Sequence, residues 1–234
     1  NLLTLSNLLC GSLAVVSALE GDLVRAFWLV MLSAVCDFFD GFAARLLKQQ
    51  SPLGVQLDSL ADDVTFGVVP AVVMYDLYAH SSSLFALDAT MMHYLGYVTL
   101  IIAAFSVLRL AKFNIDTTQS AEFSGLPTPA NALMLLSLAA LEQQGSVVLS
   151  QEHILVISVA TALLLISPIR MFALKFKGFG WRGNELRYSF ILVSLLLIIF
   201  LTTCSILAII VLYIVVSTLR WLFVRGDGSV GAKN

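Results

Sequence analysis

The chain has 234 residues, of which 59% are hydrophobic and only 12% are charged. A soluble domain carries about 25% charged residues, so this composition excludes an ordinary water-soluble globular protein and indicates an integral membrane protein. The net charge of −2 says little about partners, because the distribution of charge carries that information. Cys10, Cys36 and Cys204 lie in apolar segments without a pairing or metal-ligand spacing, which predicts free thiols that pack as small hydrophobic side chains.

Apolar stretches follow one another along the chain with only short polar breaks, and a membrane-spanning helix needs about 20 such residues. We therefore predict an all-α integral membrane protein with eight transmembrane helices. In chain order they cover Leu2–Leu19, Leu23–Leu47, Leu53–Tyr78, His93–Phe113, Pro129–Leu141, Ile154–Ala173, Leu186–Leu201 and Ser205–Val224. An alternative joins the last two stretches into one long tilted helix.

The end of the second predicted helix and the start of the third carry many carboxylates for segments this apolar. Asp37 and Asp40 lie one turn apart on the second helix, and Asp58 and Asp62 lie one turn apart on the third. Each pair therefore shares a helix face. The connection between the helices is short, and Ser51 suits the cap of the third helix, so the two acidic faces can meet.

Four carboxylates in a low-dielectric environment repel one another unless a cation lies among them. Oxygen ligands without Cys or His favour Mg²⁺ or Mn²⁺, and Ca²⁺ can occupy the same site. Four carboxylates can hold two ions, an arrangement suited to phosphoryl-type transfer. The competing interpretation needs no metal and pairs the aspartates with Arg45, Lys48, Arg109 and Lys112 in interfacial salt bridges.

Small or polar residues accompany the acidic cluster on two helices. Gly41 and Ala44 lie on the aspartate face of the second helix, and Thr4, Asn7 and Gly11 form a stripe on the first. Such residues let another helix approach closely. Beside an acidic face they are equally suited to a nucleotide, so both interpretations stay open.

The basic residues are distributed unevenly if eight helices alternate from a cytoplasmic N-terminus. Only Arg25 then lies on the outer side. The cytoplasmic side receives Arg45, Lys48, Arg109, Lys112, Arg170, Lys175, Lys177, Arg182, Arg187, Arg220, Arg225 and Lys233. Because cytoplasmic loops carry an excess of Lys and Arg, we predict a protein of the cytoplasmic membrane. Both termini and the aspartates would face the cytoplasm.

The second and third helices resemble the CDP-alcohol phosphatidyltransferase family in the motif Asp37-x2-Asp40-Gly41-x2-Ala44-Arg45-x8-Gly54-x3-Asp58-x3-Asp62, with every position matched. The resemblance implies a six-helix core, here residues 1–173, and commonly a homodimer. It also implies transfer of a phospho-alcohol group from a cytidine nucleotide to an alcohol, with release of CMP. Residues 174–234, a cytoplasmic loop, two further helices and a short tail, would be an addition to that core.

Further segments are similar to the branch of this family that uses L-serine as the acceptor. They are Asn7–Gly11, Asp58–Asp62, Phe66–Gly67, Pro70–Ala71, Arg109–Asn114 and Gly125–Ala130, whereas Asp63 stands where that branch more usually has an apolar residue. This similarity implies transfer of a phosphatidyl group from CDP-diacylglycerol, or from CDP-archaeol, to the serine hydroxyl within the lipid bilayer, without a nucleic-acid partner. The alternatives are a sister enzyme that uses glycerol 3-phosphate, inositol or inositol phosphate and, from a different class, a cation transporter with an aspartate site.

The resemblance also assigns roles to individual residues. It makes metal ligands of Asp37, Asp40 and Asp58. Asp62 becomes a ligand of a second ion, the general base that takes the proton of the serine hydroxyl, or both. The CDP site would be lined by Gly41, Ala44 and Arg45, with Thr4, Asn7 and Ser59 as neighbours of the cytidine or its phosphates.

Arg109 and Lys112 lie one turn apart at the cytoplasmic end of the fourth predicted helix. Serine brings a carboxylate, and a carboxylate or a lipid phosphate needs a cation. We expect these two residues to bind one of those anions. The alternative role is anchoring of the helix at the cytoplasmic interface.

Overall fold

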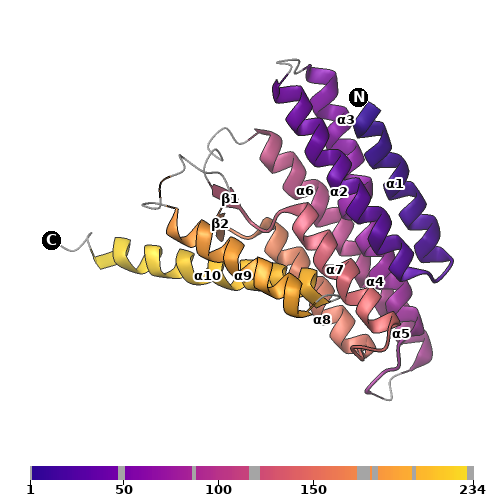
Figure 1. The fold of residues 1–234 in the computed structure, drawn as a ribbon. Helices are drawn as coiled ribbons and strands as arrows, with labels where there is room; N and C mark the ends of the chain where they lie inside the picture. Colours follow the sequence, from indigo (N-terminus) through magenta and orange to yellow (C-terminus); the bar gives the residue numbers. More distant parts are fainter. Residues whose placement is uncertain are drawn as a thin grey trace.

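The computed structural model describes residues 2–46, 51–85, 88–115, 122–172, 180, 184–201 and 204–230. Helices make up nearly all of this part of the chain (Figure 1). Their bounds are α1 Leu2–Leu19, α2 Leu23–Leu46, α3 Pro52–Asp63, α4 Val69–His80, α5 Ala89–Gly96, α6 Ile101–Ile115, α7 Thr128–Gln143, α8 Gln151–Ile166, α9 Glu185–Leu201 and α10 Ser205–Val230. A π-helical turn, η1 (Val64–Val68), joins α3 to α4, and a 3₁₀ turn, η2 (Tyr97–Leu100), joins α5 to α6.

The helices thus form eight continuous stretches at the eight positions expected from hydropathy, which confirms the all-α class. Three of them are long and apolar enough to cross a membrane by length and composition, namely Leu2–Leu19, Thr90–Ile115 and Ser205–Phe223. Gln151–Ile166 is a shorter apolar helix. The number of helices that cross the bilayer stays a prediction.

Small and polar residues of α1 face inward and large apolar residues face outward. The helix buries Thr4, Asn7, Gly11, Ala14, Ser17 and Ala18. It exposes leucines and a valine along the opposite side, namely Leu2, Leu5, Leu9, Leu13, Val16 and Leu19. This arrangement is the reverse of that in a surface helix of a soluble protein, and membrane helices pack through small residues. The chain is therefore a membrane protein.

The bundle is organised around α7, which packs against α2, α4 and α10. Its fully buried side chains include Ala132, Leu135, Leu136 and Ala139. Figure 1 shows the start of α1 beside the end of α2 and the start of α3, so three helix ends meet at one end of the bundle. The predicted acidic cluster lies at this end.

The sixth expected helix, Ile154–Ala173, is too long at its C-terminus, because α8 ends at Ile166. Ser167 has an extended conformation with ψ 152°, which is the conformation favoured before a proline, here Pro168. The chain then forms β2 (Arg170–Phe172), which pairs in antiparallel fashion with β1 (Glu122–Ser124). Three-residue strands show no periodicity that a sequence pattern reveals, so the ribbon was not predicted.

Gly125 follows β1, and backbone hydrogen bonds at this position join the ribbon to the end of α8. The nitrogen of Gly125 donates to the carbonyl of Ile169 at 2.9 Å, and the nitrogen of Leu126 donates to the carbonyl of Leu164 at 3.0 Å. Gly125 has φ +76°, and a Cβ built there would lie 2.2 Å from the carbonyl oxygen of Leu165. Only glycine fits this conformation and this close approach.

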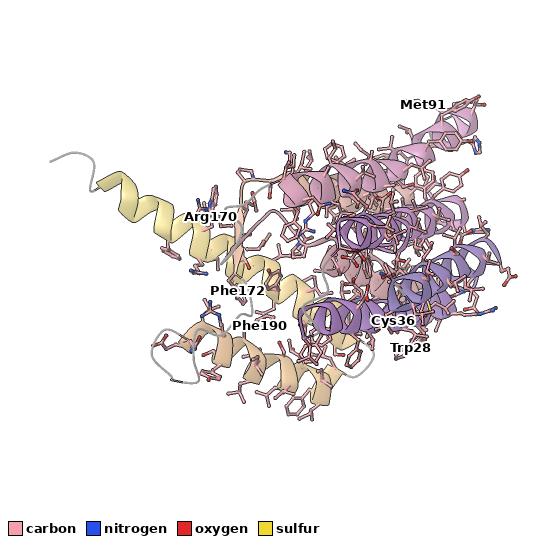
Figure 2. The ribbon with its side chains drawn as sticks, turned by 90° about the horizontal axis from the view of Figure 1, so that it is seen from above. Trp28, Cys36, Met91, Arg170, Phe172 and Phe190 are labelled. Atoms are coloured by element: carbon pink, nitrogen blue, oxygen red, sulfur yellow. The ribbon has the colours of Figure 1, made fainter. Side chains whose placement is uncertain are left out.

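The two C-terminal helices, α9 and α10, form a hairpin beside the bundle (Figures 1 and 2). They are separate helices, so the alternative of one long helix is wrong. Phe172 of β2 contacts Phe190 of α9 and Tyr213 of α10, with ring centroids 5.4 and 4.9 Å away. The Tyr213 hydroxyl also donates to the carbonyl of Phe172 at 2.9 Å. These contacts join the hairpin to the ribbon.

Candidate metal and substrate site

The two acidic faces meet where α2 ends and α3 begins. Asp37 of α2 and Asp58 and Asp62 of α3 each offer a carboxylate oxygen, and the three oxygens lie within 4.8 Å of one another. The side chains are half-buried, Asp58 lies close enough to Asp37 to repel it, and Asp62 lies within electrostatic range of both. Such a set of hard oxygen donors at metal-bridging distances fits a divalent cation of the Mg²⁺ or Mn²⁺ type.

The start of α3 is set by a local cap. The hydroxyl oxygen of Ser51 accepts a hydrogen bond from the nitrogen of Gly54 at 3.0 Å, and Pro52 occupies the first turn of the helix. Both residues favour a helix start at this point. The cap places Asp58 in the second turn of α3, opposite the end of α2.

Asp40 lies at the edge of this cluster and is not one of its three converging carboxylates. Its Oδ2 accepts a short hydrogen bond from the hydroxyl of Thr4, while its charge still acts on Asp37 and Asp58. A contact between an α1 hydroxyl and a carboxylate was not predicted, because spacing along the chain carries no information about helix pairs.

Arg109 and Lys112, the described members of the competing salt-bridge interpretation, form no ion pair with the three aspartates within the described residues. The other two members, the Arg45 side chain and Lys48, lie outside the residues that the structure describes. The salt-bridge interpretation therefore loses two of its four cations.

The residues expected at the CDP site differ in their burial and in their contacts. Thr4 and Asn7 are buried and bonded to carboxylates, since Asn7 Nδ2 donates to Asp62 Oδ1 at 3.0 Å. Gly41 is exposed beside the cluster. Ser59 accepts a hydrogen bond from Asn114 Nδ2 at 2.8 Å and thereby links α3 to α6. The side chains of Ala44 and Arg45 lie outside the described part of the structure.

Ser33 and Thr65 belong to the site although the sequence analysis did not select them. The hydroxyls of Ser33 on α2 and Thr65 on η1 lie 2.5 and 2.8 Å from Asn7 Oδ1. Both side chains are fully buried. A single hydroxyl residue inside an otherwise apolar stretch was the available signal.

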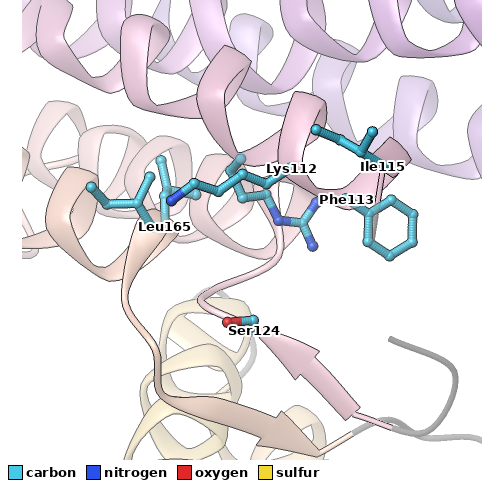
Figure 3. A pocket seen from close by; sticks show the side chains of 7 residues that line it. Lys112, Phe113, Ile115, Ser124 and Leu165 are labelled. Atoms are coloured by element: carbon cyan, nitrogen blue, oxygen red, sulfur yellow. The ribbon is translucent and has the colours of Figure 1, made fainter. Parts of the chain in front are cut away.

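A second group of residues surrounds a cavity of about 290 Å³ at the end of α6 (Figure 3). It is lined by Arg109, Lys112, Phe113, Ile115, Ser124, Leu165 and Ile166. The cavity lies between α6, the end of α8 and the ribbon, and Gly125 directly follows Ser124 of its wall. Two cations and an aromatic ring on its wall suit an anion with an apolar portion.

Arg109 is 8% exposed and forms no ion pair among the residues that the structure describes, which is rare for a buried cation. Its Nη1 donates to the Thr128 hydroxyl at 3.4 Å, and its guanidinium lies 5.4 Å from the centre of the Phe113 ring. It is also close enough to Asp62 for the two charges to attract. The cation-lined cavity and the acidic cluster are therefore neighbours.

A model of the family described as CDP-alcohol phosphatidyltransferase matches residues 1–167. The chain belongs to this family. The match ends one residue after α8 and covers both acidic helices, the cavity wall on α6 and all of α7. CDP-alcohol phosphatidyltransferases generally depend on a metal, and the converging carboxylates of Asp37, Asp58 and Asp62 fit that requirement.

Curated relatives are similar over much of the chain. A protein from Helicobacter pylori (strain ATCC 700392 / 26695) is 29% identical over 228 residues, which are 95% of this chain and 90% of the relative. A protein from Bacillus subtilis (strain 168) is 36% identical over 59% of this chain and 73% of its own length. One from Methanocaldococcus jannaschii is 33% identical over 59% of this chain and 58% of its own length. Each is named CDP-diacylglycerol–serine O-phosphatidyltransferase.

Proposed function

We propose that this protein transfers the phosphatidyl group of CDP-diacylglycerol to the hydroxyl of L-serine, giving phosphatidylserine and CMP. The observation that carries the proposal is the family match together with the shared name of relatives from bacteria and an archaeon. The meeting of the acidic faces supports it, because a nucleotide pyrophosphate needs cations that carboxylates can hold.

The metal would be held by Asp37, Asp58 and Asp62, with Asp40 at the edge. When bound, it would neutralise charge on the pyrophosphate and on the departing CMP. The protein positions the reactants around it. The carboxylate of Asp62 accepts the proton of the serine hydroxyl while the serine oxygen forms a bond to the phosphorus that carries diacylglycerol. The bond between that phosphorus and the CMP oxygen breaks.

Arg109 is the residue that we propose for the serine carboxylate. It is a buried cation within electrostatic range of Asp62, so it can hold the carboxylate of an amino acid whose hydroxyl lies at the base. Lys112 is exposed on the same cavity wall and adds positive charge at its entrance. Gly41, Ala44, Arg45 and Ser59 remain the proposed neighbours of the nucleotide.

We further propose that the six-helix core is residues 1–173, that the aspartates and both termini face the cytoplasm, and that the protein is a homodimer. The orientation is supported by the excess of Lys and Arg at the aspartate end. The dimer rests on family resemblance alone.

The test is incubation of the full chain with CDP-diacylglycerol, labelled L-serine and Mn²⁺ or Mg²⁺, followed by lipid analysis and measurement of CMP. We expect labelled phosphatidylserine and CMP in equal amounts. Parallel reactions with glycerol 3-phosphate, inositol and inositol phosphate should release much less CMP. Preferred use of one of these alcohols would replace serine as the acceptor, and cation flux through proteoliposomes without CMP release would point to a transporter.

A further inference from the structure

A buried hydrogen-bond network lies directly beneath Asp62 and joins three helical segments. Asn7 of α1 is at its centre, with no exposed surface. Its Nδ2 donates to Asp62 Oδ1 at 3.0 Å. Its Oδ1 lies 2.8 Å from the hydroxyl of Thr65 and 2.5 Å from that of Ser33. The amide thus connects the acidic cluster to two hydroxyls from η1 and α2.

The direction of these hydrogen bonds follows from the groups involved. Both hydroxyls also lie near the backbone carbonyl oxygen of Asn7, at 2.9 Å for Ser33 and 3.3 Å for Thr65. If the Asn7 amide were flipped, its oxygen would oppose a carboxylate oxygen of Asp62, which is an acceptor–acceptor contact. The carboxylate therefore sets the orientation of the amide, with its oxygen toward the two hydroxyls. Each hydroxyl has one proton and donates it to the side-chain or the backbone oxygen of Asn7.

Gly11 keeps Thr65 in this network. A Cβ at residue 11 would lie 2.2 Å from the Thr65 hydroxyl oxygen, a distance at which one of the two groups must move. Thr65 itself lies on the π-helical turn that follows Asp62, and such turns within α-helices often occur at functional sites. The small residue on α1 and the π turn therefore place the Thr65 hydroxyl against Asn7.

We propose that Asn7 is a positioning residue for Asp62, and that Thr65 and Ser33 act on the reaction through Asn7. The family resemblance had implied a place for Asn7 beside the nucleotide instead. A base must hold its oxygen within about 2.6–3.2 Å of the proton that it accepts, and a misplacement of about 1 Å costs roughly 100-fold in rate. Asn7 fixes one oxygen of Asp62, and the carboxylate can then present the other to the reaction.

The inference rests on the proposed function for its assay, and the experiment uses the full chain in detergent with saturating Mn²⁺. The variants are Asn7→Ala, Thr65→Val, Thr65→Ser and the double variant Asn7→Ala/Thr65→Val. Ser17→Ala is the matched control, because Ser17 is a buried residue of α1 whose hydroxyl donates within its own helix, at 2.9 Å to the Leu13 carbonyl. Turnover, KM for each substrate and thermal unfolding are measured for each.

We expect Asn7→Ala to lower kcat by about 100-fold while KM for CDP-diacylglycerol changes little. Thr65→Val should lower kcat by a smaller factor, and Thr65→Ser, which keeps the hydroxyl, should restore it. Because Thr65 acts through Asn7, Thr65→Val should have no further effect in the Asn7→Ala background. Ser17→Ala should have normal kinetics.

Three results would overturn the inference. A raised KM for CDP-diacylglycerol with normal kcat would make Asn7 a nucleotide contact. Equal losses from Thr65→Val with and without Asn7 would show independent structural effects. Full activity of a folded Asn7→Ala protein would exclude a positioning role of Asn7. If Asn7→Ala does not fold, kcat of Thr65→Val and Thr65→Ser still tests the inference, because equal kcat values in these two variants would exclude a role of the Thr65 hydroxyl. A wild-type protein that uses another alcohol contradicts the proposed function alone, and the same variants can then be assayed with that alcohol.

Discussion

Asp62 has both charged and hydrogen-bonding partners among the described residues of the site. Asp37 and Asp58 repel it, Arg109 attracts it, and Asn7 donates to its Oδ1. Asp58 has the other aspartates as its charged neighbours. A carboxylate held by an amide and within electrostatic range of Arg109 suits proton transfer, whereas one surrounded by like charges suits a metal ligand.

Replacement of these carboxylates by amides tests the assignment. Asp58→Asn and Asp62→Asn should each reduce CMP release by about 100- to 10,000-fold, the usual contribution of a positioned acid or base. The control is Asp76→Asn, because Asp76 lies on α4, 3.5 Å from His80 and away from the cluster. Near-normal turnover of either site variant at saturating Mn²⁺ would contradict the metal and base assignments.

Variants of Arg109 test how the protein recognises the carboxylate of L-serine. Loss of a charge-assisted hydrogen bond costs about 1.5–3 kcal/mol, so Arg109→Ala should raise KM for L-serine by about 10- to 100-fold. Arg109→Lys should recover part of this loss, because lysine keeps the charge and loses the planar pair of donors. Arg25→Ala is the control, since Arg25 is exposed and pairs with Glu20 at 3.4 Å. A rise in KM for CDP-diacylglycerol instead would assign Arg109 to the lipid phosphate.

At the scale of elements, the β1–β2 ribbon and the end of α8 complete the cavity that α6 begins. Ser124 of β1 and Leu165 of α8 both line it, and the backbone bonds around Gly125 hold these elements together. The geometry of the cavity therefore depends on one glycine with a positive φ. A loop at the other end of the bundle depends instead on a single carboxylate, that of Glu152.

Gly125→Ala should destabilise the protein and raise KM for L-serine, because the new Cβ meets the Leu165 carbonyl oxygen at 2.2 Å. Gly145→Ala is the matched control. Gly145 has a similar φ of +71° with nothing within 4 Å, so it should show only the backbone strain of about 1–2 kcal/mol. Thermal unfolding and serine kinetics measure both effects. Equal losses of stability in the two variants would contradict the predicted clash.

The first turn of α8 holds the loop after α4 through Glu152. Its carboxylate accepts from the Ser83 hydroxyl at 2.6 Å and from the nitrogen of Leu84 at 3.0 Å. The Ser83 hydrogen bond, followed by those from the backbone, lowers the pKa of Glu152 from 4.5 to about 2. Because the folded-state pKa is the lower one, the stabilisation is complete above the unfolded value of 4.5 and is lost as the pH falls toward 2.

Glu152→Gln should therefore lower the stability of this loop at neutral pH and remove the dependence of that stability on acid pH. In the wild-type protein, hydrogen exchange of the amides of Leu84 and Phe85 should accelerate relative to the rest of the chain as the pH falls below about 4.5. Glu142→Gln, a change at a half-buried position of α7, serves as the control. Identical pH profiles for wild type and Glu152→Gln would exclude this role of Glu152.

For the whole molecule, lipid is the solvent of the outer surface and polar groups gather inside and at one end. Large apolar side chains such as Leu9, Trp28 and Leu60 are more than 60% exposed, which a protein in water avoids over so wide an area. The aspartates and the cation-lined cavity lie together at the end where α1 begins. Basic residues at the same end predict that it faces the cytoplasm.

Accessibility of single cysteines tests this orientation. After replacement of the three native cysteines by alanine, Ser82→Cys and Ile115→Cys place thiols at opposite ends of the bundle, both at exposed positions. A membrane-impermeant maleimide should label residue 82 in intact cells and residue 115 only after the membrane is opened. The reverse pattern would invert the predicted topology.

Sequence alone determined the membrane class, the positions of the helices and the adjacency of the acidic pairs. These follow from local rules, because hydropathy sets helix length and spacings of three and four set a helix face. The proximity of Asp37, Asp58 and Asp62 could be predicted from the sequence because only a short, capped turn separates their helices.

Tertiary structure decided what surrounds these carboxylates. Asn7, Ser33 and Thr65 come from α1, α2 and η1, and their meeting depends on how each helix is rotated about its own axis. That rotation is set by close packing, as at Gly11 against Thr65, and no spacing along the chain encodes it. The same reason explains the unpredicted ribbon, where backbone pairing between distant segments stabilises a conformation that has no local pattern. The early end of α8 did have a local signal, Pro168.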